Sequence, residues 1–405
     1  MAKIGVFGGT FNPPHVGHLQ AAEEVKRALG LDKVLLIPDA QPPHKALPEN
    51  SPTGAERLEL VRAAIAGHPG LEASELELER SGTSYTSDTL GLLRRRYPED
   101  TLYLITGTDM FLSLHSWHAP EEICGNAVIV GMSRENDDRR GEMLAQKAAL
   151  EEKFGARVEL VQNRVVEVSS TTVRRMLILG GGEHYLPPAE LALIRERGFY
   201  GTGRDYRNLP EEELRRVATG LLKPKRVNHV LGCAETAVKL ARLNGADEHV
   251  ALRAGLLHDV TKALDGPRGE DQLLLVDKYG ILITDFERNN PKLLHAKTGA
   301  AVAKHVFGEC DEVVRAIYWH TTGKANMSRM EKIIYLADYM EPTRSFPGVE
   351  ELRKVAFRNL DQGLLMGFDL CIAELIREQK NVCRDSLEAR DFLRAQLEHR
   401  SNMEG

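Results

Sequence analysis

The stretch Gly8-Gly9-Thr10-Phe11-Asn12-Pro13-Pro14-His15-Val16-Gly17-His18 decides the fold of the first half of the chain. An apolar run over residues 4–7 precedes it and predicts a buried strand, and a helical pattern over residues 19–29 follows it. Glycines at a strand-to-helix turn let the backbone approach a ligand closely, and the N-terminus of a helix favours anions. His15 and His18 stand three residues apart, so one helical turn places both imidazoles on one face, suited to a polyphosphate. Taken alone, the stretch also fits a glycine turn with two surface histidines.

Short apolar runs recur through the first 200 residues, at 4–7, 34–38, 102–105, 127–131 and 158–161, with helical stretches between them. This rhythm predicts right-handed βαβ units and therefore an α/β domain with a doubly wound parallel sheet. Residues 210–395 show helical periodicity with almost no strand signal, which predicts an all-α second half. We place the domains at residues 1–203 and 208–395 and expect the polar residues after 395 to be frayed.

Composition narrows the class of protein. Of the 405 residues, 42% are hydrophobic and 28% are charged, as in globular domains, and the net charge of −6 argues against a general nucleic-acid coat. Five scattered cysteines without a CxxC pair predict neither a disulfide framework nor a zinc ribbon, and they fit a reducing cytoplasm. The sequence shows no signal-peptide pattern and no apolar run long enough to span a membrane, so we expect a cytoplasmic protein without a membrane partner.

Further motifs follow in a definite order. They are Pro42-Pro43-His44-Lys45, the block Arg80-Ser81-Gly82-Thr83-Ser84-Tyr85-Thr86-Ser87-Asp88-Thr89-Leu90, Gly107-Thr108-Asp109, Trp117-His118, and Val168-Ser169-Ser170-Thr171-Thr172-Val173-Arg174. With the opening motif, they make residues 1–202 resemble the nucleotidylyltransferase superfamily and, within it, bacterial nicotinate-nucleotide adenylyltransferase. The resemblance implies a Rossmann-like fold and transfer of AMP from ATP to nicotinate mononucleotide, giving nicotinate adenine dinucleotide and pyrophosphate.

The resemblance also implies roles for individual residues. His15 and His18 would be catalytic, with His18 nearest the reacting centre, and Mg²⁺ would accompany the ATP. The expected ATP-binding residues are Gly8, Gly9, Thr10, Phe11, His15, His18, Asp109, Ser169, Ser170, Thr171 and Arg174. The hydroxyl-rich block from Ser169 is also what an ordinary Ser/Thr helix cap looks like, and on its own that interpretation is favoured.

The expected residues for the nicotinate mononucleotide are Lys45, Thr86, Trp117 and Arg134. Lys45 follows two prolines that stiffen its loop, and an aromatic residue equivalent to Trp117 stacks on the pyridine ring in the family. A core tryptophan and ordinary surface residues are the alternative interpretations. Phosphopantetheine and nicotinamide mononucleotide remain alternative acceptors, but Ser84-Tyr85-Thr86 and Trp117 favour nicotinate.

The second half carries histidines and aspartates inside apolar helical segments, where burial is costly unless they are paired or bound to a metal. The candidate metal ligands are His229, His258, Asp259, His295, His320 and Asp338. Six imidazole and carboxylate ligands suit a mid-row transition ion, singly or as a pair, and Fe, Mn, Co and Zn all remain open. A lone helical histidine is more often a satisfied core or surface residue.

The adjacent pair His258-Asp259, with partners at 229 and 338, resembles the HD phosphohydrolases, and His295 and His320 resemble the extra ligands of the dinuclear subset. The segment over residues 320–344 resembles the YqeK-type HD family, and the likeness extends over residues 208–390. It implies an iron-dependent symmetrical hydrolysis of diadenosine tetraphosphate to two ADP, although Val260-Thr261 departs slightly from the family pattern. Asp259 and Lys262 would be catalytic. Phosphate or nucleoside contacts would come from Arg226, Lys262, Thr322, Gly323 and Arg344.

Together these expectations describe a bifunctional enzyme whose partners are ATP, nicotinate mononucleotide and diadenosine tetraphosphate, without nucleic acid. The alternative is an adenylyltransferase whose HD half senses nucleotides without catalysis, although the complete ligand set with Lys262 argues against it. A non-enzymatic scaffold is the least favoured interpretation. A homodimer is an expectation by analogy, and communication between the two sites is left open.

Overall fold

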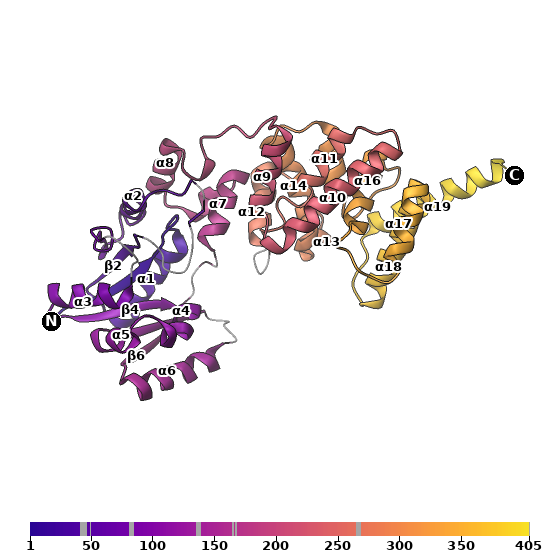
Figure 1. The fold of residues 1–405 in the computed structure, drawn as a ribbon. Coiled ribbons are helices and arrows are strands. Elements are labelled where there is room, and N and C mark those ends of the chain that lie inside the picture. The colour runs from indigo at the N-terminus through magenta and orange to yellow at the C-terminus, as the bar shows by residue number, and fades with distance from the viewer. Residues whose placement is uncertain are drawn as a thin grey trace. The chain divides into compact units, whose positions relative to one another are not determined.

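The computed structural model of the chain describes residues 1–40, 47–48, 50–80, 85–134, 139–163, 166, 168–264 and 269–404 (Figure 1). It divides into two compact units. The first unit comprises Met1–Ile178 with Gly182–Arg204, and the second comprises Leu179–Gly181 with Asp205–Gly405.

The first unit contains one six-stranded parallel sheet with the order β3-β2-β1-β4-β5-β6. Because every strand runs the same way, the carboxyl ends of all of them meet at one edge, and ligands of such sheets bind there, where the strand order reverses between β1 and β4. The predicted α/β class and the parallel sheet are confirmed. The strands are β1 (Lys3–Gly9), β2 (Lys33–Pro38), β3 (Leu71–Ala73), β4 (Thr101–Gly107), β5 (Val128–Arg134) and β6 (Val158–Asn163).

One strand was not expected from the sequence. β3 has three residues and pairs with β2 at the edge of the sheet, with Val34 opposite Leu71. A three-residue edge strand is too short to show an apolar period, so sequence reasoning passed over it.

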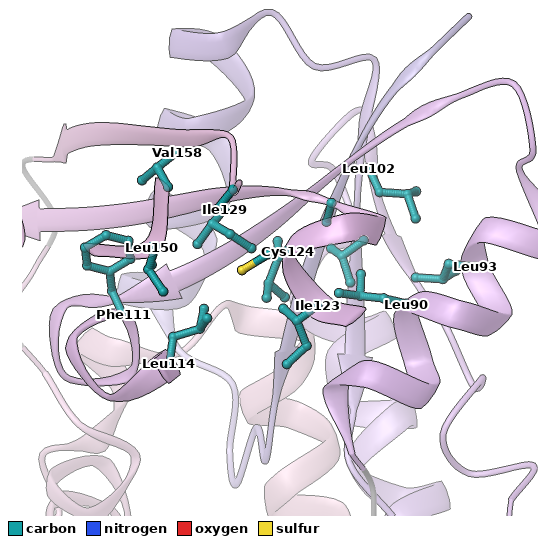
Figure 2. Close-up of a cluster of buried hydrophobic side chains, with 14 of the residues drawn as sticks. Leu90, Leu93, Leu102, Phe111, Leu114, Ile123, Cys124, Ile129, Leu150 and Val158 are labelled. Atoms are coloured by element: carbon teal, nitrogen blue, oxygen red, sulfur yellow. The ribbon is translucent and has the colours of Figure 1, made fainter. Parts of the chain in front are cut away.

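Helices cover both faces of the sheet. Side chains alternate along each strand, so Val34 and Leu36 of β2 join one apolar cluster while Leu35 and Ile37 join the other. The first of these clusters includes side chains of α1 (Val16–Leu29) and α2 (Gly54–Ala64). The second, part of which Figure 2 shows, includes those of α3 (Thr86–Arg96), α4 (Thr108–Ser113), α5 (Pro120–Asn126) and α6 (Arg140–Phe154).

The remaining helices of the first unit follow the sheet in sequence. They are α7 (Ser170–Leu179) and α8 (Pro188–Arg197), with the short 3₁₀ segments η1 (Leu114–Ser116), η2 (Gly182–Tyr185) and η3 (Phe199–Gly201). α7 begins just after the carboxyl end of β6, so its first turn lies at the edge of the sheet where ligands bind.

The second unit is helical, as predicted, and no strand occurs among its described residues. α10 packs against α11 and α16, and α15 packs against α11, α14 and α16. Gly255 lets α10 and α11 lie close together, since a Cβ added to it would lie only 2.6 Å from the Cα of Ala234. The elements are α9 (Glu211–Gly220), α10 (Pro224–Leu243), α11 (Glu248–Leu257), α12 (Glu270–Tyr279), α13 (Asp285–Asn289), η4 (Pro291–Leu293), α14 (Leu294–His305), α15 (Asp311–Trp319), α16 (Arg329–Met340), α17 (Val349–Arg358), α18 (Leu360–Arg377) and α19 (Arg384–Glu404).

The last helix, α19, continues to Glu404, and its buried Ala389 and Leu393 anchor the earlier turns. Fraying of the residues after 395 stays a prediction. Across the described parts of the chain, none of the helices is both long and apolar enough to cross a membrane.

Candidate active sites

His15 and His18 lie together where the loop after β1 enters α1. Their ring centroids are 3.6 Å apart, and the rings are stacked at 28°. The backbone N–H of His15 donates to Nδ1 of His18 over 3.2 Å, so the neutral His18 ring carries its proton on Nε2. Burial lowers the pKa of His18 to about 4, and burial together with His18 lowers the pKa of His15. At neutral pH the pair is therefore uncharged, and His18 offers an Nε2–H donor.

The first residues of α7 hold the loop that precedes these histidines. Ser170 Oγ donates to the carbonyl of Pro13 over 2.8 Å, and Arg174 Nη1 donates to the carbonyl of Asn12 over 2.5 Å. Ser169 Oγ accepts from the N–H of Thr172 at 3.1 Å, which is the helix-capping role that the sequence left open. In this structure the guanidinium of Arg174 is thus turned to the loop, with a second contact to Thr171 Oγ1 at 3.1 Å.

Two cavities open beside the loop, and both are lined by Phe7, Gly107 and Met110. The larger has a volume of 700 Å³ and is lined by Thr86 and Trp117, and the smaller has a volume of 390 Å³. Of the residues expected to bind ATP, the smaller is lined by His15, His18, Asp109, Ser169 and Ser170, and the larger by Gly8, Gly9 and Thr10. Phe11 is buried in the core beneath the loop, with a φ of 45°.

The acceptor residues are only partly described. Thr86 is the first residue of α3, and Trp117 packs against the core cluster while its indole N–H donates to Ser113 Oγ over 3.2 Å. Trp117 therefore combines the core role with a place in the cavity wall. Lys45 lies outside the described residues, and Arg134 is described only as part of the strand β5.

Sequence reasoning missed two acidic residues of the larger cavity, Asp39 and Glu77, which bring buried carboxylates to its wall. Tyr85 and His118, which belong to motifs quoted from the sequence, also line it, and their rings stack with centroids 4.4 Å apart. Asp39 directly follows the second predicted strand, so the rule that ligands meet strand carboxyl ends could have found it. Glu77 comes from an irregular segment that gave no such signal.

In the second unit, the predicted metal ligands converge from α10, α14, α16 and the ends of α11 and α15. Nε2 of His229 lies 3.0 Å from Asp338 Oδ1 and 3.3 Å from Nε2 of His258. Nε2 of His295 lies 3.2 Å from Nε2 of His320. Asp259 stands between these groups, because its Oδ2 is 3.6 Å from His258 and its Oδ1 is 3.3 Å from His295. The six residues thus form two adjoining clusters bridged by one carboxylate.

Each of the four histidines is held at its other ring nitrogen. Nδ1 of His258 is 2.7 Å from the carbonyl of Gly255, Nδ1 of His320 is 2.7 Å from that of Ile317, and Nδ1 of His295 is 2.5 Å from that of Lys292. Nδ1 of His229 is 3.0 Å from Glu341 Oε1. Carbonyl and carboxylate oxygens only accept, so every Nδ1 carries a proton and every Nε2 keeps its lone pair for the centre.

This donor set fits a transition ion. Asp259 Oδ1 is buried and accepts no hydrogen bond from any residue that the structure describes, although His295 Nε2 is near. Burial alone would raise the pKa of Asp259, but His258 and His295 outweigh it, and the pKa lies below its ordinary value. Imidazole nitrogens and carboxylate oxygens together suit Fe, Mn, Co or Zn.

Three cationic side chains surround the cluster. Arg226 Nε donates to Asp259 Oδ2 over 2.6 Å, Arg344 Nη2 donates to Asp338 Oδ1 over 2.6 Å, and Lys262 Nζ lies 3.1 Å from His295 Nε2. Burial lowers the pKa of Lys262. These positions are compatible with contacts to an anionic substrate beside a metal.

The segment after His320 contains Thr322 and Gly323, two of the residues expected to contact phosphate or nucleoside. Thr322 Oγ1 donates to the carbonyl of Gly323, and Gly323 has a φ of 67° with its Cα packed so that a Cβ would lie 2.6 Å from Phe368. Packing thus accounts for Gly323. The hydroxyl of Thr321 also reaches the cluster, because its Oγ1 is 3.2 Å from His320 Nε2. Sequence reasoning also missed Glu341, although its place one helical turn after Asp338 was a usable signal.

Comparison with known proteins matches each half separately. A family model described as cytidylyltransferase-like matches residues 6–176, and an HD domain model matches residues 226–343. A probable nicotinate-nucleotide adenylyltransferase of Pelobacter propionicus is 41% identical over 212 residues, covering 49% of this chain and 98% of that protein. One of Exiguobacterium sibiricum is 40% identical over 201 residues, covering 49% of this chain and all (100%) of that protein.

A solved structure matches with 39% identity, covering 46% of this chain and 98% of that one, with a TM-score of 0.44. It is described as a predicted HD superfamily hydrolase involved in NAD metabolism from Clostridium acetobutylicum.

Proposed function

Because the first half of this chain belongs to the nicotinate-nucleotide adenylyltransferase family, we propose that the first unit transfers AMP from ATP to nicotinate mononucleotide. The products are nicotinate adenine dinucleotide and pyrophosphate, so the reaction belongs to NAD biosynthesis. Nicotinate mononucleotide is the proposed acceptor.

The observation that carries this proposal is the pair of adjoining cavities. The smaller one is lined by the histidine pair and by Ser169 and Ser170 at the start of α7, and a helix N-terminus suits a polyphosphate. The larger one has an aromatic wall at Trp117 with Thr86 beside it, which suits a flat ring with a polar substituent. Both cavities meet at Gly107 and Met110, so two substrates bound in them would have neighbouring phosphates.

The chemistry requires alignment and charge neutralisation. An oxygen of the acceptor phosphate forms a bond to the α-phosphorus of ATP, and the bond from that phosphorus to the bridging oxygen breaks, so that pyrophosphate leaves. His18 donates its Nε2–H to a phosphate oxygen, and the helix N-terminus behind it favours the negative charge. Mg²⁺ bound to ATP would supply further neutralisation of the phosphate charge.

The test is product analysis. Purified protein incubated with ATP, Mg²⁺ and nicotinate mononucleotide should form one dinucleotide and one pyrophosphate per turnover. Replacement of the acceptor by nicotinamide mononucleotide or phosphopantetheine should lower kcat/KM by at least about tenfold, because the site would lose a contact to the nicotinate carboxylate. Equal use of all three acceptors would contradict the assigned acceptor.

For the second unit we propose metal-dependent, symmetrical hydrolysis of diadenosine tetraphosphate to two ADP. His229, His258, Asp259 and Asp338 would hold one ion, and His295, His320 and the other oxygen of Asp259 a second. Bound transition metals, with iron as the proposed ion, would supply an acidified water and neutralise phosphate oxygens.

The chain's own residues supply the rest of the site. Arg226, Lys262 and Arg344 place three positive charges around the cluster, where they pair with substrate phosphates. A water oxygen forms a bond to an inner phosphorus, the bond from that phosphorus to the central bridging oxygen breaks, and each half leaves as ADP. We assign to Lys262, whose side chain is buried beside His295, the role of stabilising the oxygen that leaves.

The test uses the whole protein with iron kept reduced. Two ADP per diadenosine tetraphosphate support the hydrolase. Unequal products, ATP with AMP, contradict the symmetrical cleavage. Metal binding without turnover favours the alternative in which the HD unit senses nucleotides.

A further inference from the structure

We propose that Arg57 is a positioning residue for adenylyl transfer, acting through the loop between β1 and α1. This inference rests on the function proposed for the first unit. Arg57 lies on α2 and its side chain is fully buried, at 0% exposure. It lines neither of the two cavities, so it acts on the reaction only through other residues.

The guanidinium of Arg57 joins the ends of two strands. Nη1 donates to the carbonyl of Thr10 over 2.6 Å and to Asp39 Oδ1 over 3.1 Å, and Nη2 donates to the carbonyl of Asp39 over 2.7 Å. Thr10 follows β1 directly and Asp39 follows β2 directly. The planar fork of arginine supplies these donors in fixed directions, which the single ammonium of lysine cannot reproduce.

Two more hydrogen bonds close the network. Thr10 Oγ1 donates to Asp39 Oδ2 over 2.9 Å, and the N–H of Asp39 donates to the carbonyl of Gly9 over 3.1 Å. Asp39 is thus held at both carboxylate oxygens and at both of its backbone polar groups. The buried cation and its carboxylate neutralise each other, which is the condition for keeping a charge in the interior.

This network holds the loop through a residue of α2, and residues of α7 hold it at two further carbonyls. Arg57 donates to the carbonyl of Thr10, Arg174 to that of Asn12, and Ser170 to that of Pro13. A planar trans peptide points its N–H opposite to its C=O, so Arg57 also directs the N–H of Phe11 away from itself. Three carbonyls within four residues are therefore held by side chains, and His15 follows two residues later.

The position of this loop matters for both substrates. Thr10 lines the larger cavity, and His15 and His18 line the smaller one. A shift of the loop by a fraction of an ångström would therefore misalign the two phosphates without removing the contacts that bind either substrate. Loss of alignment lowers kcat, whereas loss of binding contacts raises KM.

The experiment compares Arg57→Lys with Arg62→Lys. Arg62 is on the same helix, and its exposed guanidinium lies 3.2 Å from Glu75. We expect Arg57→Lys to lower kcat of adenylyl transfer by about 10- to 100-fold with KM for both substrates within about threefold of wild type. Arg62→Lys should match wild type. A wild-type kcat in a folded Arg57→Lys protein, or a raised KM with unchanged kcat, would overturn the inference.

A second variant covers the case in which Arg57→Lys does not fold. Asp39→Asn keeps an oxygen for Arg57 but turns an amide NH₂ toward the partner at Oδ2, so kcat should fall with KM again little changed. A wild-type kcat for Asp39→Asn would overturn the inference. The wild-type protein in the same assay separates a failure of the proposed function from a failure of the positioning role. A wild type that forms no dinucleotide refutes the proposed function, whereas an active wild type with a fully active Arg57→Lys refutes only the positioning role.

Discussion

His18 in the first unit accepts a hydrogen bond at Nδ1 from a backbone N–H, whereas His258 in the second unit is held at Nδ1 by a backbone carbonyl. The first arrangement leaves a proton on Nε2, and the second leaves a lone pair there. An N–H donor suits a phosphate oxygen, and a lone pair suits a metal ion. The same residue type is thus prepared for an anion in one unit and for a cation in the other by a single contact on the far side of the ring.

The surroundings of the rings agree with this difference. His18 packs against the apolar ring of Phe11, with centroids 5.2 Å apart. His229 has the carboxylates of Asp338 and Glu341 each at 3.0 Å. The comparison teaches that the histidine count of a site says little until the partners of both ring nitrogens are known.

The largest expected effect tests the cation side. Asp259→Asn removes the charge that bridges the two ligand clusters, so metal content should fall and hydrolysis should drop by about 1000-fold or more. Adenylyl transfer should stay at the wild-type rate. Metal analysis and both product assays measure this, with the exposed Asp391→Asn as a control. If a folded Asp259→Asn protein lost both activities, the hypothesis of two independent active sites would be wrong.

The anion side is tested by His18→Ala. Without the Nε2–H donor, adenylyl transfer should fall by about 100- to 1000-fold, as when a donor to a developing charge is removed. Hydrolysis of diadenosine tetraphosphate should not change. The matched control is His68→Ala, whose ring is partly exposed and lies 2.7 Å from Glu23. Retention of full transfer by His18→Ala would remove His18 from the reaction.

A smaller effect is expected at Nδ1 of His229, the ring nitrogen that faces away from the metal cluster. Glu341→Gln replaces the carboxylate beside His229 by a neutral amide, which weakens the hold on Nδ1 and should lower metal affinity by about 10- to 100-fold. Metal titration of the protein measures it, and the exposed Glu350→Gln serves as the control. An unchanged affinity would mean that Glu341 only supports the backbone at Thr343, to which it is also bonded.

The smallest expected effect is on the stability of the first unit, through the buried carboxyl group of Glu190. Glu190 on α8 is fully buried, burial raises its pKa, and within the described chain neither of its carboxylate oxygens has a hydrogen-bond partner. Because the folded-state pKa lies above the unfolded one, stability is fully present below about pH 4.5 and is lost as pH rises through the folded pKa. Glu190→Gln, which is neutral at every pH, should stabilise the first unit at pH 8 by about 1 kcal/mol.

Urea unfolding at pH 5 and pH 8 measures this difference. Trp117 is the only tryptophan of the first unit and Trp319 the only one of the second, so a Trp319→Phe background reports the first unit alone. The exposed Glu196→Gln on the same helix is the control. An unchanged pH dependence in Glu190→Gln would show that Glu190 keeps its charge when folded.

Several features of the fold and the sites could be read from the sequence because they repeat along the chain. The strand at residues 34–38 is a continuous apolar run, and the helices after residue 210 have a helical apolar period. The residues His15 and His18, and likewise His258 and Asp259, are close in sequence. The edge strand β3 could not be predicted, because three residues contain no period. The place of Thr321 Oγ1 near His320 Nε2 could not be predicted, because the turn after α15 decides which hydroxyls face the cluster.

The sequence by itself determined the two classes of domain, five of the six strands and the residue types of each site. Only the tertiary structure decided which ring nitrogen of each histidine is held, that Asp259 stands between two ligand clusters, and that Arg57 reaches the loop at Thr10 from 47 residues away. The physical reason is the range of the interactions. Periodicity and capping act between neighbours in sequence, whereas hydrogen bonds and buried charges depend on distances of a few ångströms that exist only after the helices and strands have packed.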